Sequence, residues 1–341
     1  MAHGKGRRLL PGLLAAALLL AGCAKLGGPE LINVSYDPTR EFYEEYNALF
    51  DAYWYGQTGK HVEIIQSHGG SGSQALSVSQ GLPADVVTLA LEADVQAVAN
   101  EGLIDDGWID EFPNDSSPYT STMVFLVHSG NPKHIQDWDD LVRAGVGVIT
   151  PNPKTSGGAR WNFLAAWAYA EELYGGDEAQ ITEFMRKLYQ NVLVLDSGAR
   201  ASTTSFVENG QGDVLIAWEN EAYLAMEEYP GEYELITPSI SILCQPSVAV
   251  VDEVARVNGT RKLATAYLNY LYSDEAQHLA AKYYYRPSNE EILAQYGDRF
   301  DLSIRLVTID HFGGWAAAQE KYFSDGGVFD MIYENIEPEE D

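Results

Sequence analysis

Short aliphatic runs alternate with longer amphipathic stretches along the chain from residue 31 onward. The short runs are rich in Val, Ile and Leu, which is typical of strands covered on both faces. They predict strands at 31–35, 62–66, 85–89, 122–128, 147–150, 191–195, 214–218, 233–237 and 247–251. The longer stretches predict helices at 39–55, 73–80, 92–99, 159–172, 179–189, 203–209, 261–272 and 274–282. This alternation predicts an α/β fold with mainly parallel sheets flanked by helices.

The length of the chain favours two lobes, because its 341 residues exceed the usual domain size of about 100–200 residues. Polar, proline-containing turns at 114–119 and 236–246 lead into two of the predicted strands. We expect those strands to cross between the lobes and form a two-strand hinge. The expected boundaries are residues 30–122 plus 247–341 for lobe one and residues 123–246 for lobe two.

The first 22 residues have the pattern of an export signal. Basic residues precede an apolar run at 9–20, which is too short to span a bilayer. The run ends in Leu-Ala-Gly-Cys, which resembles the bacterial lipobox and implies cleavage before Cys23 and attachment of lipid to it. The alternative is an ordinary signal peptide with a cysteine at that position by chance. Residues 1–22 are thus predicted as a lipoprotein signal peptide and 23–30 as a lipidated tether. The mature chain is expected in the periplasm or on the outer face of the cell membrane.

Acidic residues dominate the charged composition: 50 Asp and Glu stand against 21 Lys and Arg, for a formal net charge of −29. A nucleic-acid-binding surface needs concentrated Lys and Arg, so no nucleic-acid partner is expected. The same excess argues against docking on anionic lipid by charge alone, which leaves the lipid on Cys23 as the expected membrane contact. The other cysteine is Cys244, which we expect to be a small buried residue without a disulfide.

Three segments share a strand, a loop of small residues and a helix start, at 64–72, 150–159 and 195–200. A variant at 35–40 has Asp37 as the expected N-cap. Helix N-termini leave main-chain N–H groups unpaired and carry a partial positive charge, so each such turn is a candidate anion cradle. Taken singly, each loop is also explained by ordinary turn chemistry.

Longer stretches of the chain carry a family resemblance. Residues 35–40, 66–71, 84–90, 148–162, 195–201, 212–221 and 284–287 resemble the sulfate-binding proteins of bacterial sulfate and thiosulfate ABC importers. The resemblance implies two lobes of the type II periplasmic-binding-protein fold that close over one sulfate ion. It further implies a monomer that delivers sulfate to the permease and ATPase subunits of an importer, with no cofactor, no metal and no enzymatic activity.

The resemblance also implies which residues touch the anion. By position, the sulfate contacts are Asp37, Ser71, Ser156, Gly157, Gly158, Ala199 and Trp218. The donors would be main-chain N–H groups at the first six positions, the Ser156 hydroxyl and the indole N–H of Trp218. Apart from the resemblance, we interpret Arg160 and Arg200, which follow two of the cradles, as braces for carboxylates such as that of Asp37; the alternative is that both are plain surface charges.

Such a pocket would distinguish between anions by whether they carry a proton. Sulfate carries no proton at neutral pH and only accepts hydrogen bonds, whereas phosphate keeps a proton that needs an acceptor. A dry pocket made of donors therefore favours sulfate. On this reasoning Asp37 acts through its main-chain N–H and as a helix cap, with its carboxylate turned away. A carboxylate that pointed inward would favour a protonated oxyanion.

Other functions remain open from the residues themselves. Thiosulfate is the main alternative ligand, because it too is an unprotonated dianion, and other tetrahedral oxyanions are further candidates. A secreted lipoprotein hydrolase could use the segment from His68 to Ser71, although the G-x-S-x-G motif fails at Ser73. A ferric-iron site could use the phenol groups at 283–285. No Cys/His cluster has zinc-binding spacing.

Overall fold

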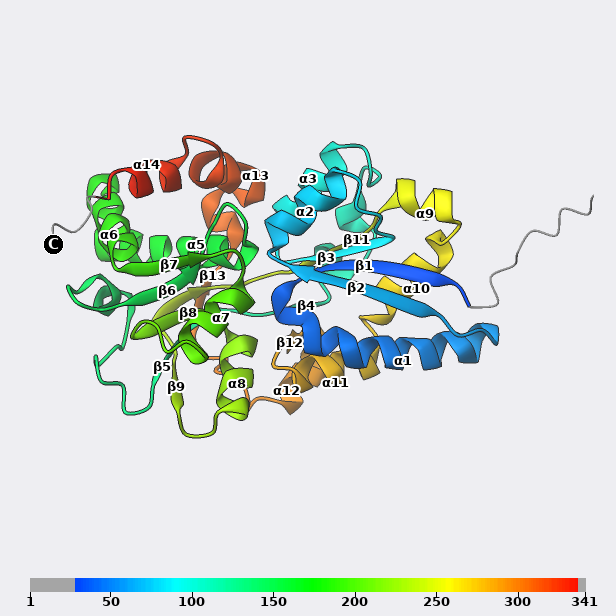
Figure 1. Ribbon diagram of the computed structural model, residues 1–341, viewed down its shortest axis with the longest axis horizontal. Coiled ribbons are helices and arrows are strands. Elements are labelled where there is room, and N and C mark those ends of the chain that lie inside the picture. The colour runs from blue at the N-terminus through cyan, green and yellow to red at the C-terminus, as the bar shows by residue number, and fades with distance from the viewer. Residues whose placement is uncertain (1–27, 337–341) are drawn as a thin grey trace, which may run out of the picture.

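The computed structural model describes residues 28–336 and consists of two α/β lobes that lie side by side (Figure 1). This confirms the predicted fold class. The predicted signal peptide, Cys23 and most of the predicted tether lie outside the described residues. No helix between residues 28 and 336 has the length and apolar character needed to cross a membrane.

Lobe one is built on a four-stranded sheet in the order β11-β3-β1-β2. Its strands are β1 (Glu30–Tyr36), β2 (Glu63–Gly69), β3 (Val86–Leu89) and β11 (Ser247–Val250). β1 runs parallel to both β2 and β3, whereas β11 pairs antiparallel with β3. Because the parallel strands end at one edge, the loops that follow β1, β2 and β3 open toward the second lobe. The helices of this lobe are α1 (Arg40–Thr58), α2 (Ser71–Ser79), α3 (Glu92–Asn100), α9 (Asp252–Asn258), α10 (Arg261–Tyr270), α11 (Asp274–Lys282) and α12 (Glu290–Gln295).

Lobe two is built on a five-stranded sheet in the order β7-β6-β8-β5-β9. Its strands are β5 (Met123–His128), β6 (Val148–Pro151), β7 (Val192–Asp196), β8 (Val214–Trp218) and β9 (Tyr233–Ile236). β6 is parallel to β7 and β8, whereas β5 is antiparallel to β8 and β9. Its longer helices are α5 (Gly157–Leu173), α6 (Glu178–Gln190), α7 (Ala199–Val207) and α8 (Glu219–Glu228).

Short elements connect these sheets and helices. They are η1 (Asp37–Thr39), η2 (Trp108–Asp110), α4 (Pro113–Ser116), β4 (Tyr119–Thr120), η3 (Trp138–Val142), β10 (Ile240–Ile242), β12 (Arg286–Pro287), β13 (Arg305–Val307), η4 (Ile309–Phe312), α13 (Gly314–Ala318), η5 (Gln319–Phe323) and α14 (Val328–Glu334). β4 pairs with β12, and β10 pairs with β13.

Two chain segments cross between the lobes side by side. Ser121 and Cys244 form an antiparallel bridge, with main-chain N–H···O distances of 3.0 and 2.9 Å. Ser121 leads into β5 of lobe two, and Cys244 leads back to β11 of lobe one. Cys244 is fully buried and free, as expected, and burial raises the pKa of its thiol.

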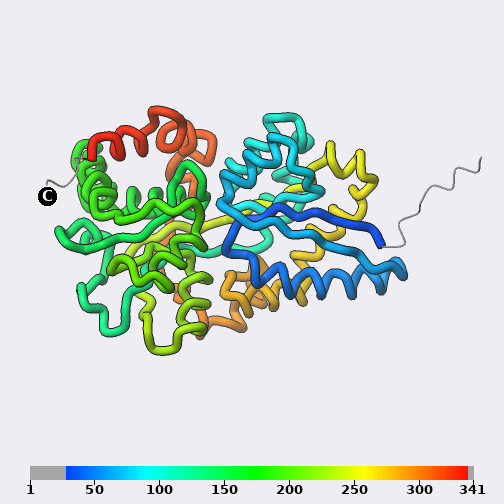
Figure 2. The backbone as a smooth tube through the Cα atoms, in the orientation of Figure 1, coloured from blue at the N-terminus to red at the C-terminus, as the bar shows by residue number. Residues whose placement is uncertain are grey.

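The C-terminal part of the chain lies with lobe two, which corrects the predicted boundary 247–341 of lobe one. β13 pairs in parallel with β10, and the ring of Trp315 lies 4.6 Å from that of Trp161 in α5. Phe329 in α14 meets Tyr189 in α6 at 5.3 Å. Figure 2 shows this red C-terminal segment beside the green chain of lobe two. The pattern of apolar residues identifies these helices but does not specify which lobe offers them a matching surface.

Candidate functional site

The four predicted cradles meet where the two lobes face each other. A Cβ placed on Gly157 of α5 would lie 3.1 Å from the Ser71 Cβ at the start of α2. A Cβ placed on Gly198, the N-cap of α7, would lie 2.4 Å from Oδ2 of Asp37 in η1. The structure therefore brings η1, α2, α5 and α7 together by their N-terminal ends.

Two glycines of α5 leave no room for a side chain. A Cβ on Gly157 would lie 2.6 Å from the Cβ of Ala90, which belongs to lobe one. A Cβ on Gly158 would lie 2.5 Å from the indole Nε1 of Trp218. Neither glycine has a positive φ, so close approach rather than backbone conformation requires glycine here. Ala199 lines the same small cavity as Gly158 and Trp218.

Trp218 ends β8 and is 1% exposed. Its indole Nε1 is buried, and within residues 28–336 it has no hydrogen-bond partner. A buried donor without a partner is costly, so native proteins rarely contain one unless a ligand or water accepts from it. The ring of Tyr36 lies 5.4 Å away and holds the indole from the lobe-one side. Trp218 is thus a fixed donor available to an acceptor beside Gly158.

The two predicted serines differ in how their hydroxyl groups are used. Ser156 is the N-cap of α5, and its hydroxyl accepts only a long bond of 3.4 Å from the N–H of Ala159. The Ser71 hydroxyl donates to Oδ2 of Asp94 at 2.6 Å and accepts from the N–H of Ala90 at 3.0 Å. Ser71 therefore has only its main-chain N–H to offer, whereas the Ser156 hydroxyl can still donate.

Asp37 differs from the expectation in two ways. It is the first residue of η1 rather than its N-cap, which is Tyr36, and it makes no capping bond. Its carboxylate is not turned away, because Oδ2 lies against Gly198 at the start of α7, where the helix dipole favours a negative charge. Burial raises the pKa of this carboxyl, and the charge of Arg40, 3.6 Å away, opposes that shift.

Arg160 braces a carboxylate across the lobes, but it is not that of Asp37. Its Nη1 donates to Oδ1 of Asp94 at 2.7 Å, and its Nε donates to the carbonyl of Pro153 at 2.9 Å. The Arg160 and Asp94 side chains are 9% and 4% exposed, so solvent screens this pair little. Sequence reasoning missed Asp94, whose only local signal is an acidic residue in the first turn of α3.

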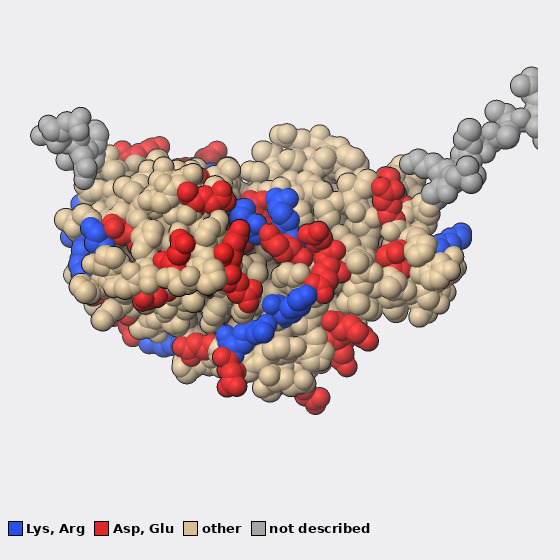
Figure 3. Space-filling view, turned by 60° about the horizontal axis from the view of Figure 1, so that its bottom comes forward, with Lys and Arg blue, Asp and Glu red and all other residues tan. Residues whose placement is uncertain are grey.

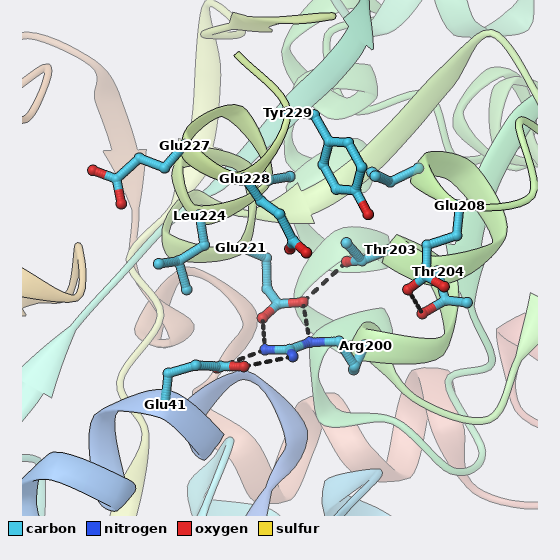
Figure 4. Close-up of a pocket in the computed structure, with 12 residues that line it drawn as sticks. Glu41, Arg200, Thr203, Thr204, Glu208, Glu221, Leu224, Glu227, Glu228 and Tyr229 are labelled. Atoms are coloured by element: carbon cyan, nitrogen blue, oxygen red, sulfur yellow. Dashed lines mark hydrogen bonds and ion pairs between the residues drawn. The ribbon is translucent and has the colours of Figure 1, made fainter.

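Arg200 also has partners other than Asp37. Figure 4 shows its guanidinium between Glu41 of lobe one and Glu221 of lobe two. The Nη1–Oε1 distance to Glu41 is 2.7 Å, and the Nη2–Oε1 distance to Glu221 is 2.8 Å. Burial opposes ionisation of Glu41, but the hydrogen bond and charge of Arg200 hold the pKa of that carboxyl below its usual value.

The three tyrosine hydroxyl groups of the alternative ferric-iron site do not converge on one point. The Tyr283 hydroxyl donates to Glu45 and the Tyr284 hydroxyl to Glu227, whereas Tyr285 is buried and accepts from Asn220. Within residues 28–336 no group of three His, Cys, Asp or Glu side chains could hold a metal ion.

A serine hydrolase, the alternative function, would need a general base beside its nucleophilic serine. His68 directs its Nδ1 toward the carbonyl of Tyr36 at 3.4 Å, and the Ser71 hydroxyl donates to Asp94 instead. Burial lowers the pKa of His68 to about 4. His68 and Ser71 are thus not arranged as a base and its nucleophile.

Comparisons with known proteins agree with this architecture. A family model described as bacterial extracellular solute-binding protein matches residues 33–286. A protein of Escherichia coli K12 named sulfate-binding protein is 59% identical over 305 residues, which cover 89% of this chain and 92% of that protein. A Pseudomonas aeruginosa protein named thiosulfate-binding protein is 49% identical, covering 94% of this chain and 97% of that one.

Among solved structures, the sulfate-binding protein SubI from Mycobacterium tuberculosis H37Rv matches with a TM-score of 0.79. The two sequences are 33% identical, and the match covers 87% of this chain and all of that chain (100%).

Proposed function

This chain belongs to the family of bacterial extracellular solute-binding proteins, and from that premise we propose that it captures sulfate between its two lobes and delivers it to an ABC importer. One observation carries the choice of ligand. The buried indole N–H of Trp218 has no partner within residues 28–336 and lies beside Gly158, where helix N-termini from both lobes meet. Such a site offers hydrogen-bond donors to an anion that can only accept hydrogen bonds.

The donors would be those of seven residues: Asp37, Ser71, Ser156, Gly157, Gly158, Ala199 and Trp218. Hydrogen bonds to a charged partner contribute about 1.5–3 kcal/mol each. Dehydration of the dianion and closure of the lobes offset much of this sum, which leaves room for the roughly −8 kcal/mol of a micromolar complex. Arg160 and Arg200 act behind the site, since both are engaged with carboxylates.

This arrangement reconciles an anionic ligand with an acidic protein. On the face drawn in Figure 3, Asp and Glu are spread over both lobes, and Lys and Arg gather in short stretches among them. Main-chain and indole dipoles act at close range inside the site, whereas the surface charges are screened by salt. The net charge therefore does not exclude sulfate.

Ligand binding and lobe closure are expected to favour each other, because the contacts between the lobes lie within the ligand-binding segments. The N–H of Ser73 in α2 donates to the carbonyl of Thr155 at 3.2 Å, and the indole of Trp161 donates to the carbonyl of Ala90 at 2.9 Å. The pair of Arg160 with Asp94 closes the same seam. A closed, loaded monomer is the form that the permease and ATPase subunits of the importer would recognise.

Thiosulfate is the second candidate ligand. The identity of 49% to a relative named for thiosulfate favours it, and thiosulfate is likewise a dianion without a proton. Hydrogen phosphate is expected to bind more weakly, because its proton needs an acceptor in a pocket of donors. The carboxylate of Asp37 and the unpaired Oδ1 of Asn162 are two groups near the site that could supply one.

Isothermal titration of the exported chain with sulfate, thiosulfate, hydrogen phosphate, molybdate and ferric citrate separates these ligands. We expect a micromolar or tighter complex with sulfate and weak or absent binding of phosphate and ferric citrate. Tighter binding of thiosulfate would select the second candidate. Absence of heat with both sulfur anions would contradict the proposal. Turnover of a chromogenic ester that is lost in Ser71→Ala would instead support the hydrolase.

We further propose that the chain acts outside the cytoplasm, in the periplasm or on the outer face of the membrane, held there by lipid on Cys23. Mass spectrometry of the processed N-terminus tests this. The expected result is a lipid-modified Cys23 and release of Cys23→Ser from the membrane fraction. An unmodified N-terminus at another cleavage position would contradict it.

A further inference from the structure

Asn162 links the helix that begins the lobe-two half of the site to two strands beneath it. It lies in the second turn of α5 and is 3% exposed. Its Nδ2 donates to Oγ1 of Thr150 at 2.9 Å and to the carbonyl of Ile216 at 3.2 Å. Thr150 belongs to β6, just before the cradle loop, and Ile216 belongs to β8, two residues before Trp218.

The orientation of this amide follows from its partners. The carbonyl of Ile216 can only accept, so the NH₂ group must face it and Oδ1 must point away. Oδ1 is buried, and within the described part of the chain it has no hydrogen-bond partner. Asn162 also lines the small cavity that it shares with Gly158, Ala199 and Trp218. Its amide thus adjoins the proposed ligand site.

A contribution to stability alone does not account for this side chain. A buried amide with one unpaired oxygen carries a desolvation cost, whereas an apolar residue of similar volume would fill the same space without it. Two bonds to different strands, however, restrict both sliding and rotation of the start of α5 over the sheet. The amide therefore supplies geometry rather than net stability.

We propose that Asn162 is a positioning residue that sets the distance between the N–H groups of Gly157 and Gly158 and the indole of Trp218. The helix donors and the strand donor then converge on a tetrahedral dianion of one size. This inference rests on the proposed sulfate function. It predicts that Asn162 determines discrimination by size, in addition to affinity.

The test compares sulfate with molybdate, a larger tetrahedral dianion, in Asn162→Leu and Asn162→Asp. The leucine removes both bonds, and the carboxylate keeps the shape but has no hydrogen for Ile216. Sulfate affinity should fall about 10- to 100-fold, because the N–H groups of Gly157 and Gly158 and the indole of Trp218 lose the fixed spacing that fits the dianion. Molybdate affinity should fall less, so the ratio of the two affinities should drop about tenfold. Titration gives both affinities, and thermal unfolding without ligand gives the stability of each variant.

Asn33 provides a matched control in lobe one. It is fully buried, donates from Nδ2 to the Tyr267 hydroxyl at 3.3 Å and accepts from Thr88 at 3.0 Å. Asn33→Leu and Asn33→Asp should lower the unfolding temperature without changing the sulfate-to-molybdate ratio. Asn162→Ser replaces the leucine variant if that variant does not fold.

An unchanged ratio in the folded Asn162 variants, or an equal change in the Asn33 variants, would overturn the inference. Absence of sulfate binding by the unsubstituted protein would contradict the proposed function instead.

Discussion

The two lobes contribute to the candidate site in different ways. Lobe two brings donors that are still open: the Trp218 indole has no partner in the described residues, and the Ser156 hydroxyl has only a long capping bond. Lobe one brings groups that are already engaged. The Ser71 hydroxyl is bonded to Asp94 and Ala90, and Asp37 adds a carboxylate. If the proposed function is correct, lobe two would hold the anion and lobe one would close over it with main-chain N–H groups.

The difference indicates how a hinged binding protein can divide its work. The lobe that holds the ligand needs rigid donors, and the lobe that closes needs contacts that form only with its partner. Side-chain substitutions should therefore affect affinity more in lobe two than in lobe one. The following experiments test that asymmetry.

The largest effect is expected at Gly157. Gly157→Asp introduces bulk where a Cβ would lie 2.6 Å from Ala90, and it adds a negative charge beside the anion. Sulfate binding should fall below detection in titration. Gly56→Asp is the matched control, because a Cβ on Gly56 of α1 meets nothing within 4 Å. Retained binding in Gly157→Asp would show that the site lies elsewhere.

Trp218→Phe should have the next largest effect. It removes the indole N–H but keeps an aromatic ring, and affinity should fall by about 1–3 kcal/mol through one lost charged hydrogen bond. Trp54→Phe is the control, since the Trp54 indole N–H is also buried without a partner in the described residues but lines a different pocket of lobe one. We expect tryptophan fluorescence to change when sulfate is added, and this change should be lost only in Trp218→Phe. Equal affinities of the two variants would remove Trp218 from the site.

The two serines provide the most direct comparison of the lobes. Ser156→Ala should weaken sulfate binding by about 1–2 kcal/mol, because an open donor is lost. Ser71→Ala should change affinity by less than about 1 kcal/mol and should mainly lower the free energy of unfolding, because its hydroxyl serves Asp94 and Ala90. Titration and thermal unfolding of both variants measure the difference. A larger loss of affinity in Ser71→Ala would reverse the assignment of roles.

The smallest effect concerns the pH dependence at Asp37. Burial raises the pKa of this carboxyl, so the folded protein holds that proton more tightly than the unfolded chain. Stability should therefore fall as the pH rises through the range between the usual and the raised pKa. Sulfate affinity should rise by up to about 1 kcal/mol as the pH falls through the raised pKa, because an ionised Asp37 repels the dianion. Asp37→Asn should remove both dependences, and their persistence in that variant would assign them to other groups.

Much of the fold followed from local patterns. The apolar runs at 86–89 and 214–218 are strands, as predicted, because strands covered on both faces must be apolar throughout. The helix predicted at 203–209 begins earlier, at Ala199, directly after its N-cap Gly198 and within the predicted cradle segment 195–200.

The candidate site was only partly predictable. The strand–glycine–helix segments identify the cradles, and the family resemblance adds Trp218, which no local pattern selects. Arg160 and Arg200 pair with carboxylates, as expected, but these are Asp94, Glu41 and Glu221 and not the example Asp37. The expected direction of the Asp37 carboxylate was wrong. Charged side chains pair with whatever carboxylate the fold brings near, and that neighbour can be far away in the chain.

The amino-acid sequence alone determined the elements of this protein, its family and the turns that could cradle an anion. These depend on residue period and on glycine, which act over a few neighbouring positions. Only the tertiary structure decided that the C-terminal helices join lobe two and that Arg160 pairs with Asp94. It also decided that Asn162 donates hydrogen bonds to two strands, β6 and β8, near Trp218. Such contacts join residues that are distant in the chain: those of Asn162 and of the C-terminal segment form when lobe two folds, and that of Arg160 with Asp94 forms when the lobes close.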